Sequence, residues 1–257
     1  DDFANRPYTK TDLKLLNLAD LSVEDVTSVP WIAQAVWSPD GKRLAVTGGP
    51  RLFGDIGVNV RDGQIPNDYD GPVYLYDIAS KNATALTRTF NPSVNSMKWR
   101  DNKNLLLNVM EGEYQPLYNY NLRSQVFRKM NGGADVIGAF DVSSDGNTAV
   151  YFGSGVKSPG KAYVMDLKKN KSNLLHFPGR SEFRNTTFGD VKDFRFKNSR
   201  GDNIDGRVYY PPNFDATKKY PALVHYYGGT VPVNRSFGGR YPNNLFAANG
   251  YIVYVLQ

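Results

Sequence analysis

The 257-residue chain contains 40% hydrophobic and 22% charged residues, which is the composition of a globular protein that can bury a core. Its net charge of +6 does not indicate nucleic-acid binding, because the basic residues are scattered and the longest basic cluster, residues 168–171, is typical of a solvated turn. The absence of cysteine excludes disulfides, cysteine zinc sites and a thiol nucleophile. No run of eighteen apolar residues predicts a membrane span, and no cofactor or metal is expected.

The composition predicts many short strands joined by turns. Aromatic residues are frequent, with 17 Tyr, 14 Phe and 3 Trp, and 24 Gly and 15 Pro residues are spread between the apolar segments. Aromatic side chains favour strands, whereas glycine and proline interrupt them. Residues 13–27 form the first such segment, and they predict the last two strands of a four-stranded unit.

Three later segments repeat one pattern, in which a strand end is followed by an Asp-Gly or Asp-Asn turn and then by an apolar strand. Aspartate suits this turn because it can hydrogen-bond its own backbone, and glycine suits it because it accepts a positive φ. Each segment therefore predicts a β-hairpin. The hairpins are expected at residues 36–46, 98–108 and 141–151.

Two further strands are predicted after each hairpin. The first has alternating side chains and is expected at residues 73–80, 117–124 and 162–169. The second is short and is expected at residues 83–87, 125–130 and 172–177. Four strands per unit, repeated at spacings of 61 and 44 residues, are typical of β-propeller blades.

The repeats predict a mainly β fold, in which residues 1–189 form a partial β-propeller of about three and a half four-stranded blades. A Gly- and Asp-rich insertion at residues 48–71 explains why the first unit is longer. A β-sandwich of short strands is the alternative fold.

Residues 37–42 and 163–167 resemble the TolB-like propeller repeat, which is informative about fold and nearly silent on function. Trp37, Trp99 and Phe140 occupy matching positions in the three repeats. All three are predicted to be packing residues.

A second domain is predicted at residues 190–257, where the repeat pattern ends. It starts with two strands joined by a glycine-containing turn, and two prolines end the second strand because proline cannot donate to a sheet ladder. Two apolar runs with a short helix between them follow, and this order predicts the beginning of an α/β sheet. The hairpin, the two runs and the helix are expected at residues 191–214, 220–227, 251–256 and 242–250.

Motifs of this second domain carry a family resemblance. Residues 209–215, residues 218–223 and Tyr227-Gly228-Gly229, taken with the preceding blades, resemble the prolyl oligopeptidase family of serine peptidases, most closely its dipeptidyl peptidase IV branch. The resemblance implies that the chain is a fragment, made of later propeller blades and the truncated start of an α/β-hydrolase peptidase domain. The full chain would cleave dipeptides from peptide amino termini through a Ser-Asp-His triad.

The nucleophile, acid and base that the resemblance implies are not in this chain. The family's serine lies in a Gly-x-Ser-x-Gly motif, and this sequence contains none. The two histidines are His176, expected to be a surface or packing residue on a blade's outer strand, and His225, expected to be structural or supporting. Residues 225 and 227 share a strand face. The 257-residue chain is therefore predicted to be inactive by itself.

Tyr227 is the one catalytic element that the resemblance implies here. In this family a tyrosine at the end of a hydrolase strand lends its hydroxyl to the oxyanion hole, and such a fixed donor stabilises the charge of a tetrahedral intermediate. Gly228 and Gly229 are expected to let the backbone turn sharply beside that oxygen. The alternative is a buried tyrosine packed against the sheet. Thr230 departs from the proline that is common at this position in the branch, which puts the course of the loop in question.

Glu111 and Glu113 are spaced to share a strand face. In the dipeptidyl peptidase branch, paired propeller glutamates hold the amino terminus of the substrate. The residues around Glu111 and Glu113 do not match that motif, so both are predicted to be solvated charges at a strand end.

The expected partners are peptide substrates, with a homodimer left open, and neither nucleic acid nor a membrane span is expected. The resemblance implies a periplasmic or otherwise extracytoplasmic location, while a cytoplasmic one stays open. Two other functions also remain as alternatives. One is a non-enzymatic β-propeller module that binds peptides or proteins, and the other is a pseudoenzyme.

Overall fold

The computed structural model describes residues 10–67, 69–229 and 231–257. These residues divide into two compact units, which are described separately. The first holds residues up to Glu111 together with Leu117–Met130 and Val142–Thr148. The second holds Gly112–Pro116, Asn131–Asp141 and Ala149–Gln257. No helix in the described part of the chain is long and apolar enough to cross a membrane.

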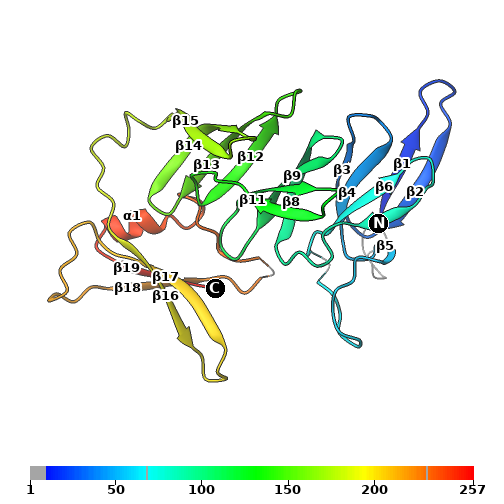
Figure 1. The fold of residues 1–257 in the computed structure, drawn as a ribbon. Coiled ribbons are helices and arrows are strands. Elements are labelled where there is room, and N and C mark those ends of the chain that lie inside the picture. Colours follow the sequence, from blue (N-terminus) through cyan, green and yellow to red (C-terminus); the bar gives the residue numbers. More distant parts are fainter. Residues whose placement is uncertain (1–9, 68, 230) are drawn as a thin grey trace. The chain divides into compact units, whose positions relative to one another are not determined.

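The first unit begins with a two-stranded antiparallel sheet of β1 (Thr11–Leu16) and β2 (Val23–Val29), the blue hairpin of Figure 1. Leu13 and Val26 of this hairpin pack against a buried cluster that includes Tyr74. The strand pair predicted for residues 13–27 is therefore present.

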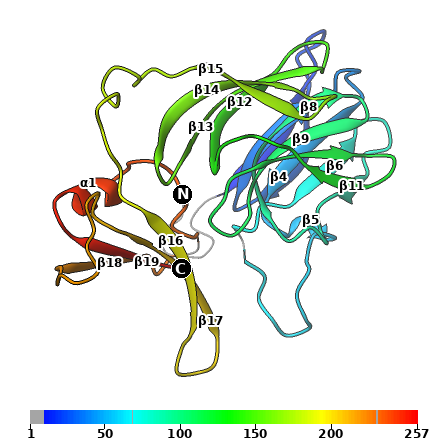
Figure 2. The same ribbon diagram turned by 60° about the vertical axis from the view of Figure 1, so that its left-hand side comes forward.

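The first four-stranded sheet follows the predicted order of hairpin, alternating strand and short strand. Its hairpin turns as expected, because Asp40 accepts hydrogen bonds from the Ser38 hydroxyl and the Lys42 N–H, and Gly41 has a φ of 66°. The insertion adds β5 (Leu52–Asp55) and the long cyan loop of Figure 2. The sheet consists of β3 (Ile32–Trp37), β4 (Arg43–Gly48), β6 (Val73–Asp77) and β7 (Ala83–Ala85).

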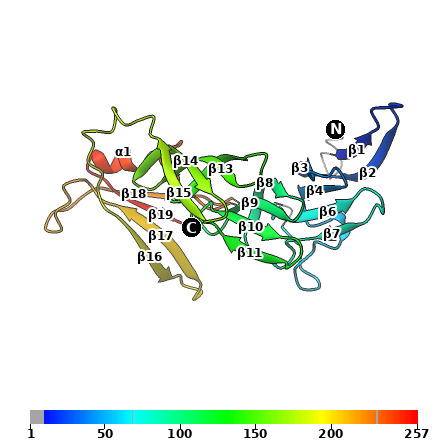
Figure 3. The same cartoon turned by 45° about the horizontal axis from the view of Figure 1, so that its top comes forward.

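Two more four-stranded sheets repeat this order, and Figure 3 shows the strands of the second sheet side by side. The second sheet consists of β8 (Ser93–Asp101), β9 (Asn104–Met110), β10 (Leu117–Asn121) and β11 (Val126–Lys129). The third consists of β12 (Val136–Val142), β13 (Thr148–Gly155), β14 (Ser158–Asp166) and β15 (Lys171–His176). The prediction of a mainly β chain with propeller-like four-stranded blades is confirmed.

The packing prediction for the repeated aromatic residues is wrong for Trp37. The Trp99 indole packs against a buried cluster and donates a hydrogen bond to the Val36 carbonyl of the preceding sheet at 3.1 Å. Trp37 is 53% exposed. Trp99 has a four-stranded sheet before it, whereas the described residues before β3 form only the two-stranded β1–β2 sheet.

A mixed sheet in the second unit has the order β16-β17-β19-β18, and only its β18–β19 pair is parallel. Tyr209, Val253 and Ala247 form its buried core. Gly250, with a φ of 88°, follows the end of the short helix, which appears in red in Figure 1. The elements are β16 (Val191–Lys197), β17 (Asn203–Tyr209), β18 (Ala222–Tyr226), α1 (Asn243–Ala248) and β19 (Ile252–Leu256).

These elements lie where the sequence predicts them, and β17 ends one residue before the two prolines. The second compact unit contains both this mixed sheet and most of the third four-stranded sheet. A domain boundary at residue 190 stays a prediction.

Candidate functional site

Tyr227 directly follows β18. Because β18 and β19 are parallel, their carboxyl ends meet at one edge of the sheet, which is where ligands bind in sheets of this type. The Tyr227 side chain is 60% exposed, so it is not a buried tyrosine packed against the sheet. Its hydroxyl is accessible to a bound molecule.

Gly229 gives the Tyr227 ring its room. A Cβ atom at position 229 would overlap the ring and lie 2.6 Å from the tyrosine hydroxyl oxygen. At Gly228 an added Cβ would meet nothing within 4 Å. Neither glycine has a positive φ, so the pair does not form the left-handed turn that favours glycine. Glycine is needed at position 229 because the Tyr227 side chain lies so close to it.

A cavity of about 280 Å³ adjoins Tyr227. It is built from the end of β18, the start of α1 and the loop between them, all within the second unit. His225 and Tyr227 both line it, which agrees with their predicted common strand face. The described lining residues are His225, Tyr227, Pro232, Val233, Asn234, Ser236, Gly238, Gly239, Arg240, Tyr241 and Asn243.

His225 is half-buried, and its ring lies 4.6 Å from the Tyr241 ring. Its Nδ1 atom is buried without a hydrogen-bond partner among the described residues. None of the carboxylates in the described part of the chain bonds to the imidazole, as the third member of a triad would. The contact with Tyr241 agrees with a structural or supporting role.

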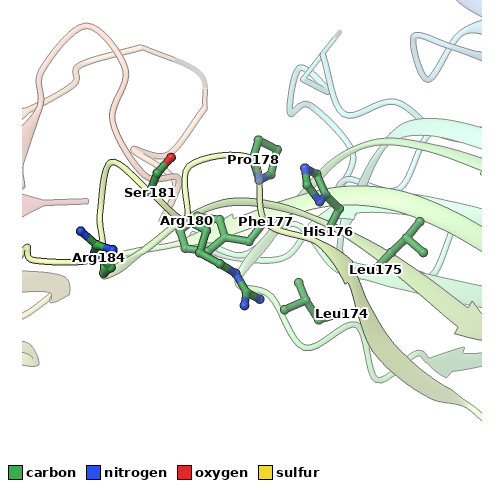
Figure 4. Close-up of a pocket in the computed structure, with 8 residues that line it drawn as sticks. All are labelled: Leu174, Leu175, His176, Phe177, Pro178, Arg180, Ser181 and Arg184. Atoms are coloured by element: carbon green, nitrogen blue, oxygen red, sulfur yellow. The ribbon is translucent and has the colours of Figure 1, made fainter.

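His176 is exposed at the end of β15 and lines another hollow, of about 550 Å³. Figure 4 shows that the guanidinium groups of Arg180 and Arg184 in this hollow point to different sides. The basic groups therefore do not converge on one ligand. The cavity beside Tyr227 is the better candidate site.

Arg207 is the largest of the described fully buried side chains, with 1% exposure. It hydrogen-bonds to the loop that forms one wall of the cavity. It donates to the Val233 carbonyl at 3.1 and 3.2 Å and to the Asn234 carbonyl at 2.6 Å. It also forms an ion pair with Glu113 and donates to the Tyr209 hydroxyl at 3.1 Å. All the donors of a guanidinium group are thereby used, as a buried charge requires.

Arg235 is a second buried arginine, and it contacts the same glutamate. It pairs with Asp193 at 2.8 Å and with Asp135 at 3.2 Å, and its guanidinium lies 4.8 Å from the Tyr114 ring centre. Burial acts to lower the pKa of Arg235, but its hydrogen bonds to Asp193 and Glu113 outweigh burial and raise that pKa. The guanidinium therefore remains charged.

The main chain of this loop is also held by neutral groups. The side chain of Gln257 accepts a hydrogen bond from the Val233 N–H at 2.9 Å and donates to the Val233 carbonyl at 2.8 Å. The Ser154 hydroxyl accepts from the Phe237 N–H at 3.2 Å. One wall of the cavity is thus fixed at several points.

The prediction that Glu111 and Glu113 are solvated strand-end charges is wrong for Glu113, whereas the Glu111 side chain remains partly exposed. Glu113 joins the two buried arginines, and Glu111 accepts a hydrogen bond from the Tyr118 hydroxyl at 2.7 Å and pairs with Lys129. Partial burial acts to raise the pKa of Glu111, but the hydrogen bonds from Lys129 and Tyr118 outweigh it and lower that pKa. The physical reason is that the Glu113 carboxylate pairs with two buried arginines that are distant in the sequence.

Sequence reasoning missed Arg207 and Arg235 as site-building residues. A signal existed for Arg207, because it lies inside an apolar strand between Gly206 and Val208, and a charged residue in a buried strand requires a partner. Arg235 lies in a loop, where no local pattern distinguishes a buried arginine from a solvated one.

In the full-length protein, Gly229→Ala is expected to lower the kcat of a reaction that uses the Tyr227 hydroxyl by roughly tenfold to a hundredfold, because the added methyl group displaces the Tyr227 ring. Gly228→Ala is the matched control, since a methyl group there meets open space. Steady-state kinetics of the two variants would check this. Equal kcat values would contradict the close approach at position 229.

No protein-family model matches the chain. Solved peptidase structures nevertheless share its fold. An acylaminoacyl peptidase of Pyrococcus horikoshii has a TM-score of 0.74 at 20% identity, over 98% of this chain and 36% of that chain. A puromycin hydrolase has a TM-score of 0.66 at 18% identity, over 97% of this chain and 37% of that chain. The chain therefore has the fold of one part of such peptidases.

Curated relatives identify the class more closely. A probable dipeptidyl-peptidase 5 of Emericella nidulans is 26% identical over 227 residues, which are 85% of this chain and 29% of that protein. The dipeptidyl-peptidase 5 of Porphyromonas endodontalis is 31% identical over 141 residues, or 53% of this chain and 20% of that protein. That of Porphyromonas gingivalis is 23% identical over 252 residues, or 95% of this chain and 34% of that protein.

The chain thus spans between 20% and 34% of the length of these relatives. The resemblance to prolyl oligopeptidase-family peptidases is confirmed, and the partial coverage agrees with the prediction of a fragment. The relatives that it matches in sequence are named dipeptidyl-peptidases.

Proposed function

We propose that the chain is part of a serine-type dipeptidyl peptidase, in which Tyr227 donates its hydroxyl to the oxyanion hole. The observation that carries this proposal is the position of Tyr227, exposed at the carboxyl end of a parallel strand and beside a cavity. Attack on a peptide carbonyl concentrates negative charge on one oxygen, and a donor already fixed nearby stabilises that charge without rearranging. The mixed sheet would then be the first part of an α/β-hydrolase domain.

The rest of the chemistry is assigned to residues outside this sequence. A serine in a Gly-x-Ser-x-Gly turn, with an aspartate and a histidine, would supply nucleophile and base. The 257 residues alone are expected to be inactive because the sequence has no such serine motif. An oxyanion donor without a nucleophile gives little turnover.

The test is to treat the full-length protein from which this chain comes with a fluorophosphonate probe and to assay dipeptide release from peptide amino termini. We expect covalent labelling and dipeptide products from the full-length protein, and neither from the 257-residue chain. Labelling with longer products would replace the dipeptidyl assignment by an endopeptidase. A full-length protein that binds peptides without labelling or hydrolysis would favour the non-enzymatic module or the pseudoenzyme.

We also propose that the full-length protein is periplasmic or otherwise extracytoplasmic, on the family resemblance alone. Cell fractionation would test this, and recovery with cytoplasmic markers would contradict it. The homodimer stays a prediction that light scattering of the full-length protein would check.

A further inference from the structure

The described lining of the cavity beside Tyr227 includes a positively charged residue and no negatively charged one. Among its described lining residues Arg240 is the one Lys or Arg, and none is Asp or Glu. Arg240 is exposed and forms no ion pair or hydrogen bond with any described residue. We propose that Arg240 makes this cavity a subsite for a carboxylate of the peptide substrate.

Arg240 is held at the cavity by aromatic contacts. Its guanidinium carbon lies 5.6 Å from the centre of the Tyr241 ring, and the Tyr241 ring lies 4.6 Å from the ring of His225. His225 is on β18, two residues before Tyr227. A short series of contacts therefore connects the cationic group to the strand that positions the proposed oxyanion donor.

The backbone before Arg240 supports this placement. Gly238 and Gly239 have φ values of 80° and 91°, a conformation that side chains other than glycine rarely adopt. An added Cβ at either position would meet nothing within 4 Å, so the conformation rather than space requires glycine. The loop thereby brings a cationic residue to the cavity, while the buried Arg207 and Arg235 are already paired with acidic groups.

Two residues that line the cavity carry polar atoms without a partner. His225 Nδ1 and Asn243 Oδ1 are buried and have no hydrogen-bond partner in the described parts of the chain. The exposed guanidinium of Arg240 can bind a carboxylate with paired N–H donors. The site therefore suits a peptide segment that carries a negative charge.

This subsite rests on the proposed function, since it takes the ligand to be a peptide. Peptides offer two sources of the same group, an Asp or Glu side chain and the carboxyl terminus of a short substrate. Both would bring a carboxylate to Arg240 while the scissile carbonyl lies at Tyr227.

The experiment starts from a peptide that the full-length protein cleaves. Each residue flanking the scissile bond is replaced in turn by Asp or Asn, and the carboxyl terminus is made as acid or amide. At one of these positions kcat/KM is expected to be about tenfold higher for the charged member of the pair. The position identifies the source of the carboxylate.

Three variants then test the residue. Arg240→Gln is expected to bring the charged-to-neutral ratio of kcat/KM close to one. Arg240→Lys is expected to keep part of the preference for the charged peptide, because lysine retains the charge but not the paired N–H donors of the guanidinium. Arg180→Gln removes another exposed arginine of the same unit, away from this cavity, and should leave the ratio unchanged. A ratio near one in the wild type, or an unchanged ratio in Arg240→Gln, would overturn the subsite.

Calorimetric binding of the same acid and amide peptides separates this inference from the proposed function. If the full-length protein is not labelled and cleaves nothing, the proposed function fails. Weaker binding of the charged peptide to Arg240→Gln than to wild type would then still support the subsite, and equal binding would overturn it.

Discussion

Replacing Arg207 with methionine is expected to lower the free energy of unfolding of the full-length protein by about 3–5 kcal/mol. Methionine fills much of the same space, but it leaves the carboxylate of Glu113 without one of its two buried cationic partners. It also removes the donors to the carbonyls of Val233 and Asn234. An unpaired buried polar group loses its hydration without compensation, which is why the effect is large.

Urea-induced unfolding of the full-length protein would measure this change. Arg195→Met is the matched control, because Arg195 pairs with Asp205 on the same β16–β17 hairpin but in an exposed position, and little loss of stability is expected there. The double variant Arg207→Met/Glu113→Leu should recover part of the lost free energy of unfolding, since it also removes the carboxylate that the single variant leaves without Arg207. Similar losses for Arg207→Met and Arg195→Met would show that the buried network does not stabilise the fold.

The blades could be predicted from the sequence because their information is local. An Asp turn such as Ser38-Pro39-Asp40-Gly41 closes its own hydrogen bonds, and the apolar and aromatic residues of β6 or β10 indicate a strand within five residues, with side chains buried on both faces. The same holds for the prolines that follow β17. Each of these signals acts between residues that are close in the chain.

The wall of the candidate site could not be predicted in this way. Arg207 and Glu113 are separated by 94 positions, and Arg235 and Glu113 by 122. Nothing local in the sequence encodes which carboxylate reaches which guanidinium, since the pairing depends on how distant segments pack. A pattern could show only that Arg207, inside an apolar strand, needed some partner.

Tyr227 was located by resemblance, but the close approach of its ring to Gly229 could not be predicted. Gly-Gly after a strand indicates a sharp turn, and the chain bends at Gly229, where glycine also makes room for the aromatic ring. The glycines of this loop that do have a positive φ are Gly238 and Gly239, each ten residues further along the chain. Sequence alone does not separate these uses, because both appear as the same dipeptide.

Tyr227→Phe in the full-length protein is expected to lower kcat by about 100- to 1,000-fold, the usual effect of removing one oxyanion donor. The phenyl ring still fits over Gly229, so only the hydroxyl is lost. KM should change little, because the hydroxyl bonds the charged oxygen of the transition state more strongly than the carbonyl of the bound substrate.

Tyr226→Phe provides the matched control. Tyr226 is the last residue of β18, is 71% exposed, and does not line the cavity. As adjacent strand residues point to opposite faces, its hydroxyl cannot serve the same oxygen, and kcat should stay close to wild type. If Tyr227→Phe also kept wild-type kcat while fluorophosphonate still labelled the serine, the oxyanion donor would have to be another group, and Tyr227 would be a wall of the cavity alone.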